Sequence, residues 1–260
     1  MTLLMPYVWA FVFGAIIGSF LNVCIHRLPR QGSIIWPGSH CPACSAPISP
    51  WDNIPIVSYL LLGGRCRACR ARISLRYPLV ELANALGYVV ILWRFGIGWT
   101  ALVYALLFSA LLVITFVDLA HLIVPDVITL PGIVLGFLLA ATVLPVGLVD
   151  SLLGILVGGG LLWFLAWVSP YLFGKEGMGG GDIKLLAMIG AFLGWKPTLL
   201  TVMIAAIVGS VVGLSLIASK AMQRNQYLPF GPFLALGAVM AMLFHQEMLS
   251  WYFGLIGPLP

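Results

Sequence analysis

The chain has 260 residues, of which 62% are hydrophobic and only 8% are charged; its formal net charge is +5 and its mean hydropathy is +1.09. A soluble domain carries about 25% charged residues, so this composition excludes a water-soluble globular fold. The polar–apolar alternation that a transmembrane β-barrel needs is also absent. The composition therefore predicts an all-α, polytopic membrane protein.

Long apolar runs divide the chain into candidate membrane helices. Residues 99–117 contain no charge over 19 positions, which is enough to cross a hydrocarbon core of about 30 Å at about 1.5 Å per residue. Hydropathy predicts about eight such spans. They lie at roughly 5–25, 78–95, 99–117, 127–145, 149–173, 183–194, 198–219 and 230–250. The first is predicted to be an uncleaved anchor, because its basic residues follow the apolar run instead of preceding it.

Lysine and arginine predict the orientation. Segment 26–77 holds seven arginines and a single acid, Asp52. The positive-inside rule places this segment in the cytoplasm and the N-terminus outside. Threading eight spans from there puts 11 of the basic residues on the cytoplasmic side or its boundary and leaves only Arg94 and Lys196 outside. Topology thus accounts for the positive net charge, and no nucleic-acid partner is expected.

The same division predicts three parts: a first transmembrane helix (1–25), a cytoplasmic cysteine-rich loop (26–77) and a seven-helix membrane domain (78–260). The loop contains two CxxC pairs separated by 21 residues, with ligand positions Cys41, Cys44, Cys66 and Cys69. Two such pairs are typical of a tetrahedral, structural Zn²⁺ site in a zinc ribbon. Two disulfides or four free thiols are the alternatives, and disulfides are disfavoured in a reducing compartment.

Acidic residues in or beside spans are costly and therefore candidates for function. Asp118 ends the third span, Asp182 opens the sixth behind a glycine run, and Glu81 lies near the start of the second. Asp126 and Asp182 have a simpler interpretation as N-terminal caps of helices. For Glu81 the simpler interpretation is an ion pair with Arg76 or Arg72, and for Lys184 it is snorkelling to the interface instead of pairing with an aspartate.

Two aspartates from different helices are suited to acid–base catalysis. Carboxylates about 3 Å apart share a proton, so one activates water while the other protonates or hydrogen-bonds a scissile carbonyl. The glycines beside Asp182 would let an extended substrate backbone come close. Intramembrane acids also serve proton-coupled transporters, so composition alone leaves this alternative open.

Five motifs, in order, resemble the bacterial type IV prepilin peptidases, which are membrane aspartic proteases of the GxGD type. They are GSFLNVCIHRLP (18–29), the cysteine-rich segment 41–83, DLAHLIVPD (118–126), GMGGGDIK (177–184) and LPFGPFLALGA (228–238). The resemblance implies that Asp118 and Asp182 are the catalytic pair. It assigns supporting roles to Gly179, Gly181, Lys184 and Asp126.

The resemblance also implies the reaction. Members act on prepilins or pseudopilins, which span the membrane. They remove a short basic leader from these substrates at the cytoplasmic face of the bacterial inner membrane. They then methylate the new N-terminus with S-adenosylmethionine, and the four cysteines match the bifunctional form. The sequence has no Gly-rich methyltransferase fingerprint, and we expect Glu81 to contact the amine of the new N-terminus or of the donor.

Two other functions compete with this one. A proton-coupled transporter would use Asp118 and Asp182 as relay sites, although no internal repeat is visible in the sequence. A non-catalytic zinc-ribbon scaffold of a pilus or secretion assembly would not need both aspartates. Membrane lipid is an expected partner of the chain under each hypothesis.

Overall fold

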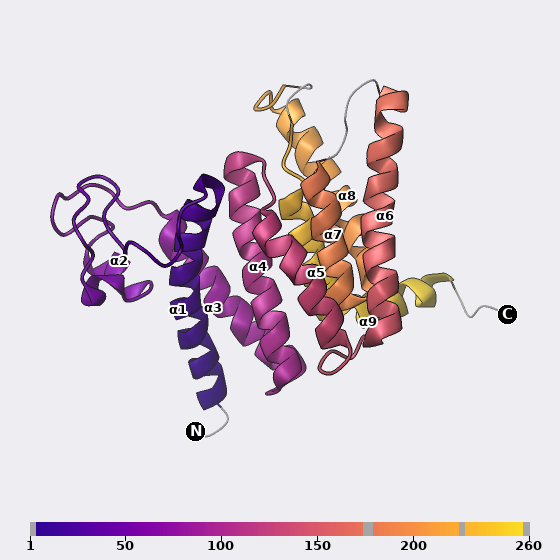
Figure 1. The fold of residues 1–260 in the computed structure, drawn as a ribbon, viewed down its shortest axis with the longest axis horizontal. Coiled ribbons are helices and arrows are strands. Elements are labelled where there is room, and N and C mark those ends of the chain that lie inside the picture. Colours follow the sequence, from indigo (N-terminus) through magenta and orange to yellow (C-terminus); the bar gives the residue numbers. More distant parts are fainter. Residues whose placement is uncertain (1–3, 174–178, 224–226, 257–260) are drawn as a thin grey trace. The chain divides into compact units, whose positions relative to one another are not determined.

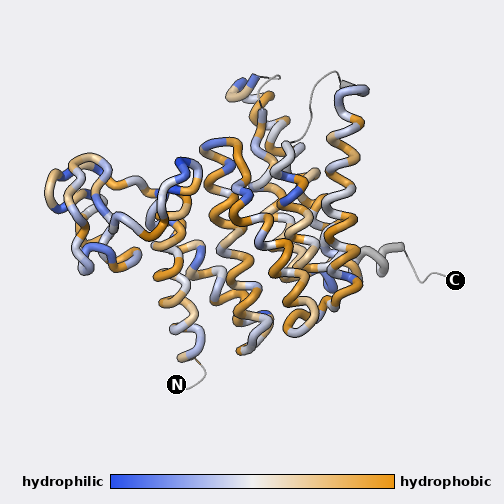
Figure 2. Tube along the Cα trace, in the orientation of Figure 1, coloured by the Kyte–Doolittle hydropathy of each residue, from blue (hydrophilic) through white to orange (hydrophobic). Residues whose placement is uncertain are grey.

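The computed structural model describes residues 4–173, 179–223 and 227–256. Over these ranges the chain forms nine α-helices and two short 3-10 helices, with no β-strand. The predicted all-α class is confirmed. Figure 1 shows the helices, and Figure 2 shows that apolar residues run along most of their lengths.

Eight of the α-helices lie at the positions of the predicted spans. They are α1 (Met5–Arg27), α3 (Arg76–Phe95), α4 (Trp99–His121), α5 (Asp126–Ala140), α6 (Gly147–Phe173), α7 (Gly180–Leu193), α8 (Trp195–Ala218) and α9 (Gly231–Ile256). Within the described residues, six of them are long and apolar enough to cross a membrane: α1, α3, α4, α6, α8 and α9. The other two, α5 and α7, have 15 and 14 residues.

The segment between α1 and α3 holds the remaining helices: η1 (Leu28–Arg30), η2 (Pro50–Asn53) and α2 (Val57–Leu61). The chain divides into two compact units, Met1–Val117 and Asp118–Pro260. The first unit therefore contains the cysteine-rich loop, and the second begins in the last turn of α4.

In the first unit, α1 packs directly on α3. Gly14 and Gly18, one helical turn apart on α1, make this possible. A Cβ atom at either position would lie 2.7 Å from a Cα atom of α3, that of Ala85 or Glu81. Small residues at this spacing let two membrane helices approach to backbone contact.

In the second unit, α7 is the central helix and packs on α5, α6, α8 and α9. Every residue from Leu185 to Leu193 is buried, as expected for a helix that is apolar on all sides. The backbones of α6 and α7 are in contact at Gly154 and Gly190. A Cβ atom added at either glycine would overlap the carbonyl oxygen of the other. Gly194, with φ of 81°, ends α7, as glycine commonly ends helices.

Candidate active site and metal centre

Asp118 lies in the last turn of α4 and is only 5% exposed. Its Oδ2 atom accepts a hydrogen bond of 2.9 Å from the backbone N–H of Gly231, the first residue of α9. The first N–H groups of a helix have no partner inside the helix and lie at the positive end of its dipole. A buried carboxylate is therefore well placed there.

Gly231 contacts Asp118 through its backbone because it has no side chain. A Cβ atom at this position would lie 2.7 Å from Oδ2 of Asp118, which is closer than real Cβ contacts allow. Gly231 is not among the site residues predicted from the sequence. The signal was present in the motif LPFGPFLALGA, which contains it.

Asp182 is the third residue of α7, following the cap residue Gly179, so it is not itself the cap. It is partly exposed, and its carboxyl group interacts electrostatically with that of Asp118. The structure thus brings the two predicted aspartates within electrostatic range of each other, although they are 64 residues apart in the sequence. Asp182 lies in the first turn of α7, and Asp118 accepts from the first N–H of α9.

The two glycines predicted to assist catalysis have different surroundings. Gly181 packs against Val124 of the α4–α5 connection, where an added Cβ would lie 2.8 Å from the valine Cβ. Gly179 is exposed, and the nearest atom to a Cβ added there is Oδ2 of Asp182, at 3.8 Å. Gly177 and Met178, in the same motif, lie outside the described residues.

Lys184, two residues after Asp182 in α7, forms an ion pair with Asp126. The Nζ atom of Lys184 donates to both carboxylate oxygens of Asp126, at 2.8 and 2.7 Å. Asp126 is the first residue of α5 and follows the cap residue Pro125, so its carboxylate pairs with lysine and makes no helix cap. The ion pair joins the start of α5 to the first turns of α7. With side chains 39% and 54% exposed, it contributes about 0–1 kcal/mol on its own.

The four predicted metal ligands gather in the first unit. The sulfur atoms of Cys41, Cys44, Cys66 and Cys69 all lie within 4.8 Å of one another, and none is in a disulfide. An all-thiolate set of this size and spacing fits tetrahedral Zn²⁺. These four cysteines would hold the ion and leave no open position, so the metal would be structural.

Two equivalent turns build this cluster. The N–H of Cys41 donates to Ala46 and the N–H of Cys66 to Ala71, each over the turn that contains its CxxC pair. The backbone N–H groups of Ala43 and Cys44 point at the Cys41 sulfur and lower the pKa of that thiol to about 7. The thiolate is the form of cysteine that binds metal, so a lowered pKa favours metal binding.

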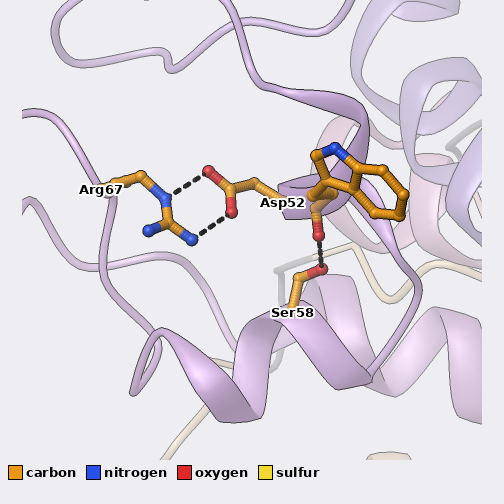
Figure 3. Close-up of polar contacts among 4 residues, drawn as sticks. Asp52, Ser58 and Arg67 are labelled. Atoms are coloured by element: carbon orange, nitrogen blue, oxygen red, sulfur yellow. Dashed lines mark hydrogen bonds and ion pairs between the residues drawn. The ribbon is translucent and has the colours of Figure 1, made fainter.

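Hydrogen bonds within the loop support the second turn. Arg67, between the two cysteines of the second pair, binds both carboxylate oxygens of Asp52 at 2.8 and 2.7 Å (Figure 3). This guanidinium holds the pKa of Asp52 below its ordinary value. Ser58 of α2 donates to the carbonyl of Trp51 at 3.0 Å. These contacts hold η2 against α2 and against the turn that contains Cys66 and Cys69.

Glu81 belongs to the first unit and is 7% exposed. Its Oε2 atom accepts the backbone N–H of Ile56 at 2.7 Å, and the Ser19 hydroxyl also donates to the carboxylate. The described residues show no ion pair between Glu81 and Arg72 or Arg76. The carboxylate is therefore held by the loop backbone and by α1.

Comparisons with known proteins agree with the motifs. Residues 12–95 match the bacterial peptidase A24 N-terminal domain, and residues 105–214 match the type IV leader peptidase family. Curated relatives named prepilin leader peptidase/N-methyltransferase include one from Pseudomonas aeruginosa, 39% identical over 95% of this chain and 93% of the relative. Another, from Stutzerimonas stutzeri, is 40% identical over 94% and 92%. No solved structure matches the chain.

Proposed function

The chain belongs to the type IV leader peptidase family, and we propose that it cleaves the leader from prepilins or pseudopilins and then methylates the new N-terminus. It is a multi-pass membrane enzyme. The observation that supports the peptidase mechanism most strongly is that the carboxyl groups of Asp118, in the last turn of α4, and Asp182, in the first turn of α7, lie within electrostatic range of each other.

In this mechanism, Asp118 is the general base and Asp182 the general acid. Asp118 already accepts the N–H of Gly231, so one of its oxygens is oriented and the other is available to take a proton from water. The hydroxide attacks the scissile carbonyl carbon while Asp182 gives its proton to the carbonyl oxygen. The C–N bond of the resulting tetrahedral intermediate then breaks: the leaving amine receives the proton held by Asp118, and Asp182 takes back a proton from one of the two hydroxyl groups as the new carboxylic acid forms.

The substrate backbone passes Gly179 and Gly180, which are exposed and precede Asp182 by three and two residues. The absence of side chains there lets an extended peptide approach the carboxyl pair. Gly181 supports the site differently, by packing on Val124, and the Lys184–Asp126 pair holds α5 against α7. These residues position the catalytic pair and take no part in proton transfer.

The proposed location is the bacterial inner membrane, with the loop 26–77 and the carboxyl pair on the cytoplasmic side. The basic character of the loop supports this orientation. A membrane-spanning substrate then presents its leader junction at the same face. We assign the peptidase to residues 78–260 and associate methyl transfer with residues 26–77.

Methyl transfer requires a donor, and the bifunctional relatives make S-adenosylmethionine the proposed one. When bound, it supplies an electrophilic methyl group. Glu81 is the candidate residue for holding an amine during this step, because its carboxylate is buried beneath the loop. Normal methylation by a Glu81→Gln protein would remove that assignment. The zinc ion is proposed to stabilise the loop.

The test of the peptidase mechanism is cleavage of a purified prepilin in lipid by three carboxylate variants. Asp118→Asn and Asp182→Asn each keep the size of the side chain but cannot exchange the proton, so we expect either to abolish cleavage. Asp126→Asn removes only an exposed ion pair and is expected to lower the rate about two- to fivefold.

Each variant is compared with wild type for its melting temperature, so that loss of cleavage is not mistaken for loss of folding. Cleavage at a normal rate by Asp118→Asn or by Asp182→Asn would reject the aspartate pair. Abolition by Asp126→Asn together with normal cleavage by Asp118→Asn would move the first catalytic position to Asp126.

A further inference from the structure

Two asparagines in the first unit are buried, and they differ in whether both ends of the side-chain amide have hydrogen-bond partners. Asn84 of α3 is fully buried and uses both ends of its amide: Nδ2 donates to the Gly14 carbonyl at 2.8 Å, and Oδ1 accepts from Ser109 at 2.9 Å. Such satisfied pairs join membrane helices. Asn84 is therefore explained by packing alone.

Asn22 of α1 is not explained in this way. It is 2% exposed, and its Nδ2 atom donates to the carbonyl of Tyr77 at 3.1 Å and more weakly to that of Gly18 at 3.4 Å. Its Oδ1 atom has no hydrogen-bond partner. Buried polar atoms almost always have one, and an unpaired acceptor in a dry environment is costly. A donor from outside the chain would satisfy it.

A buried carboxylate lies next to this orphan acceptor along the helix pair. Gly18 of α1 packs directly on Glu81 of α3, and Asn22 is one helical turn beyond Gly18, opposite Tyr77. Asn22 and Glu81 are thus one turn apart on the facing sides of α1 and α3. The contact between α1 and α3 therefore contains the carboxylate of Glu81 and, one turn away, the Oδ1 atom of Asn22, which has no hydrogen-bond partner.

The loop residue that contacts the Glu81 carboxylate has a strained backbone conformation. Ile56, whose N–H binds the carboxylate, has φ of 62°. A β-branched residue rarely adopts this region, and such outliers concentrate at binding sites. The loop is thus fastened over the carboxylate at a conformational cost. This arrangement suits a site that must exclude water.

We propose that Asn22 and Glu81 bind a primary ammonium group. A carboxylate and an amide oxygen both accept hydrogen bonds, so together they suit a cationic group that carries N–H donors and would repel an anion. This inference rests on the proposed methyl transfer, which presents two such groups: the α-ammonium of the donor and the new N-terminus of the cleaved chain. Arg76, whose Nε is buried without a partner, lies next to Tyr77 on α3.

The experiment measures binding to the full chain in detergent by calorimetry. The probes are S-adenosylhomocysteine, a short peptide with a free N-terminus, and the same peptide acetylated at its N-terminus. The variants are Asn22→Ala and Glu81→Gln, with Asn84→Ala as the matched control on the same helix pair. Glu81→Gln keeps an oxygen for the Ile56 N–H and removes only the charge.

We expect Asn22→Ala and Glu81→Gln to weaken one amine probe about 10- to 100-fold, as loss of a charge-assisted contact predicts, and Asn84→Ala to bind it as wild type does. The weakened probe identifies the source of the ammonium group, and the acetylated peptide should not bind at this site. Zinc content and melting temperature report folding of each variant.

Wild-type binding by both Asn22→Ala and Glu81→Gln would overturn the inference while leaving methyl transfer intact. An equal loss in Asn84→Ala would also overturn it, because binding would then follow helix packing. If the wild-type protein binds neither amine probe, the inference falls together with the proposed methyl transfer.

Discussion

At the scale of single residues, the proposed active site depends on one backbone group. Gly231 donates its N–H to Asp118 from the first position of α9. The contact requires a residue without a side chain, because a Cβ would lie 2.7 Å from the carboxylate oxygen. The geometry of the catalytic pair is thus sensitive to a single methyl group.

The change Gly231→Ala should lower leader cleavage about 10- to 100-fold, because the added methyl group forces Asp118 to move and small displacements of a catalytic group are costly. The measurement is the cleavage rate in lipid with saturating prepilin. Gly160→Ala is the control, since a Cβ there meets nothing within 4 Å. Equal rates for the Gly231→Ala protein and wild type would show that this contact does not position Asp118.

At the scale of elements, the cysteine-rich loop is built from two matching turns. Each turn places two thiols near the other pair, and the Asp52–Arg67 ion pair fastens the second turn to η2. The apolar residues of the loop do not form a buried core, because Cys41 is the only buried apolar side chain among residues 28–75, all of which are described. A bound metal is the expected source of its stability.

We therefore expect one Zn²⁺ per purified chain by elemental analysis. Cys44→Ser should lose most of the metal, because removal of one thiolate breaks the tetrahedral set. Cys24→Ser is the matched control, since Cys24 lies in α1 and outside the cluster. Full zinc content in Cys44→Ser, or disulfides in place of free thiols in the purified wild type, would contradict the metal site.

At the scale of the whole molecule, eight helices account for the hydropathy pattern. Six are long enough to span a membrane by length and composition, and each of the two short ones, α5 and α7, has an aspartate in its first turn. Asp126 starts α5, and Asp182 lies in the first turn of α7.

The proposed orientation predicts which side each connection faces. A cysteine introduced at Gly98, between α3 and α4, should react with a membrane-impermeant maleimide in intact spheroplasts. A cysteine at Gly38, in the loop, should react only after lysis. Both positions are exposed and have no neighbour within 4 Å of an added Cβ, so accessibility is matched. The reverse labelling pattern would invert the topology.

The sequence alone determined the helical membrane class, the positions of eight apolar helices and the four metal-ligand candidates. Hydropathy and CxxC spacing are carried by contiguous residues, which is why they can be read without a structure. The sequence could not decide between Asp118 and Asp126 on composition, and the family resemblance made that choice.

Only the tertiary structure decided which side chains meet. Asp118 and Gly231 are 113 residues apart, and Lys184 and Asp126 are 58 apart. The helix-cap hypotheses for Asp126 and Asp182 failed because Pro125 and Gly179 hold the cap positions. The unfilled acceptor of Asn22 was equally invisible in the sequence, since asparagine there reads as part of an apolar helix. Contacts between distant helices depend on how their surfaces pack, and local sequence carries no record of that.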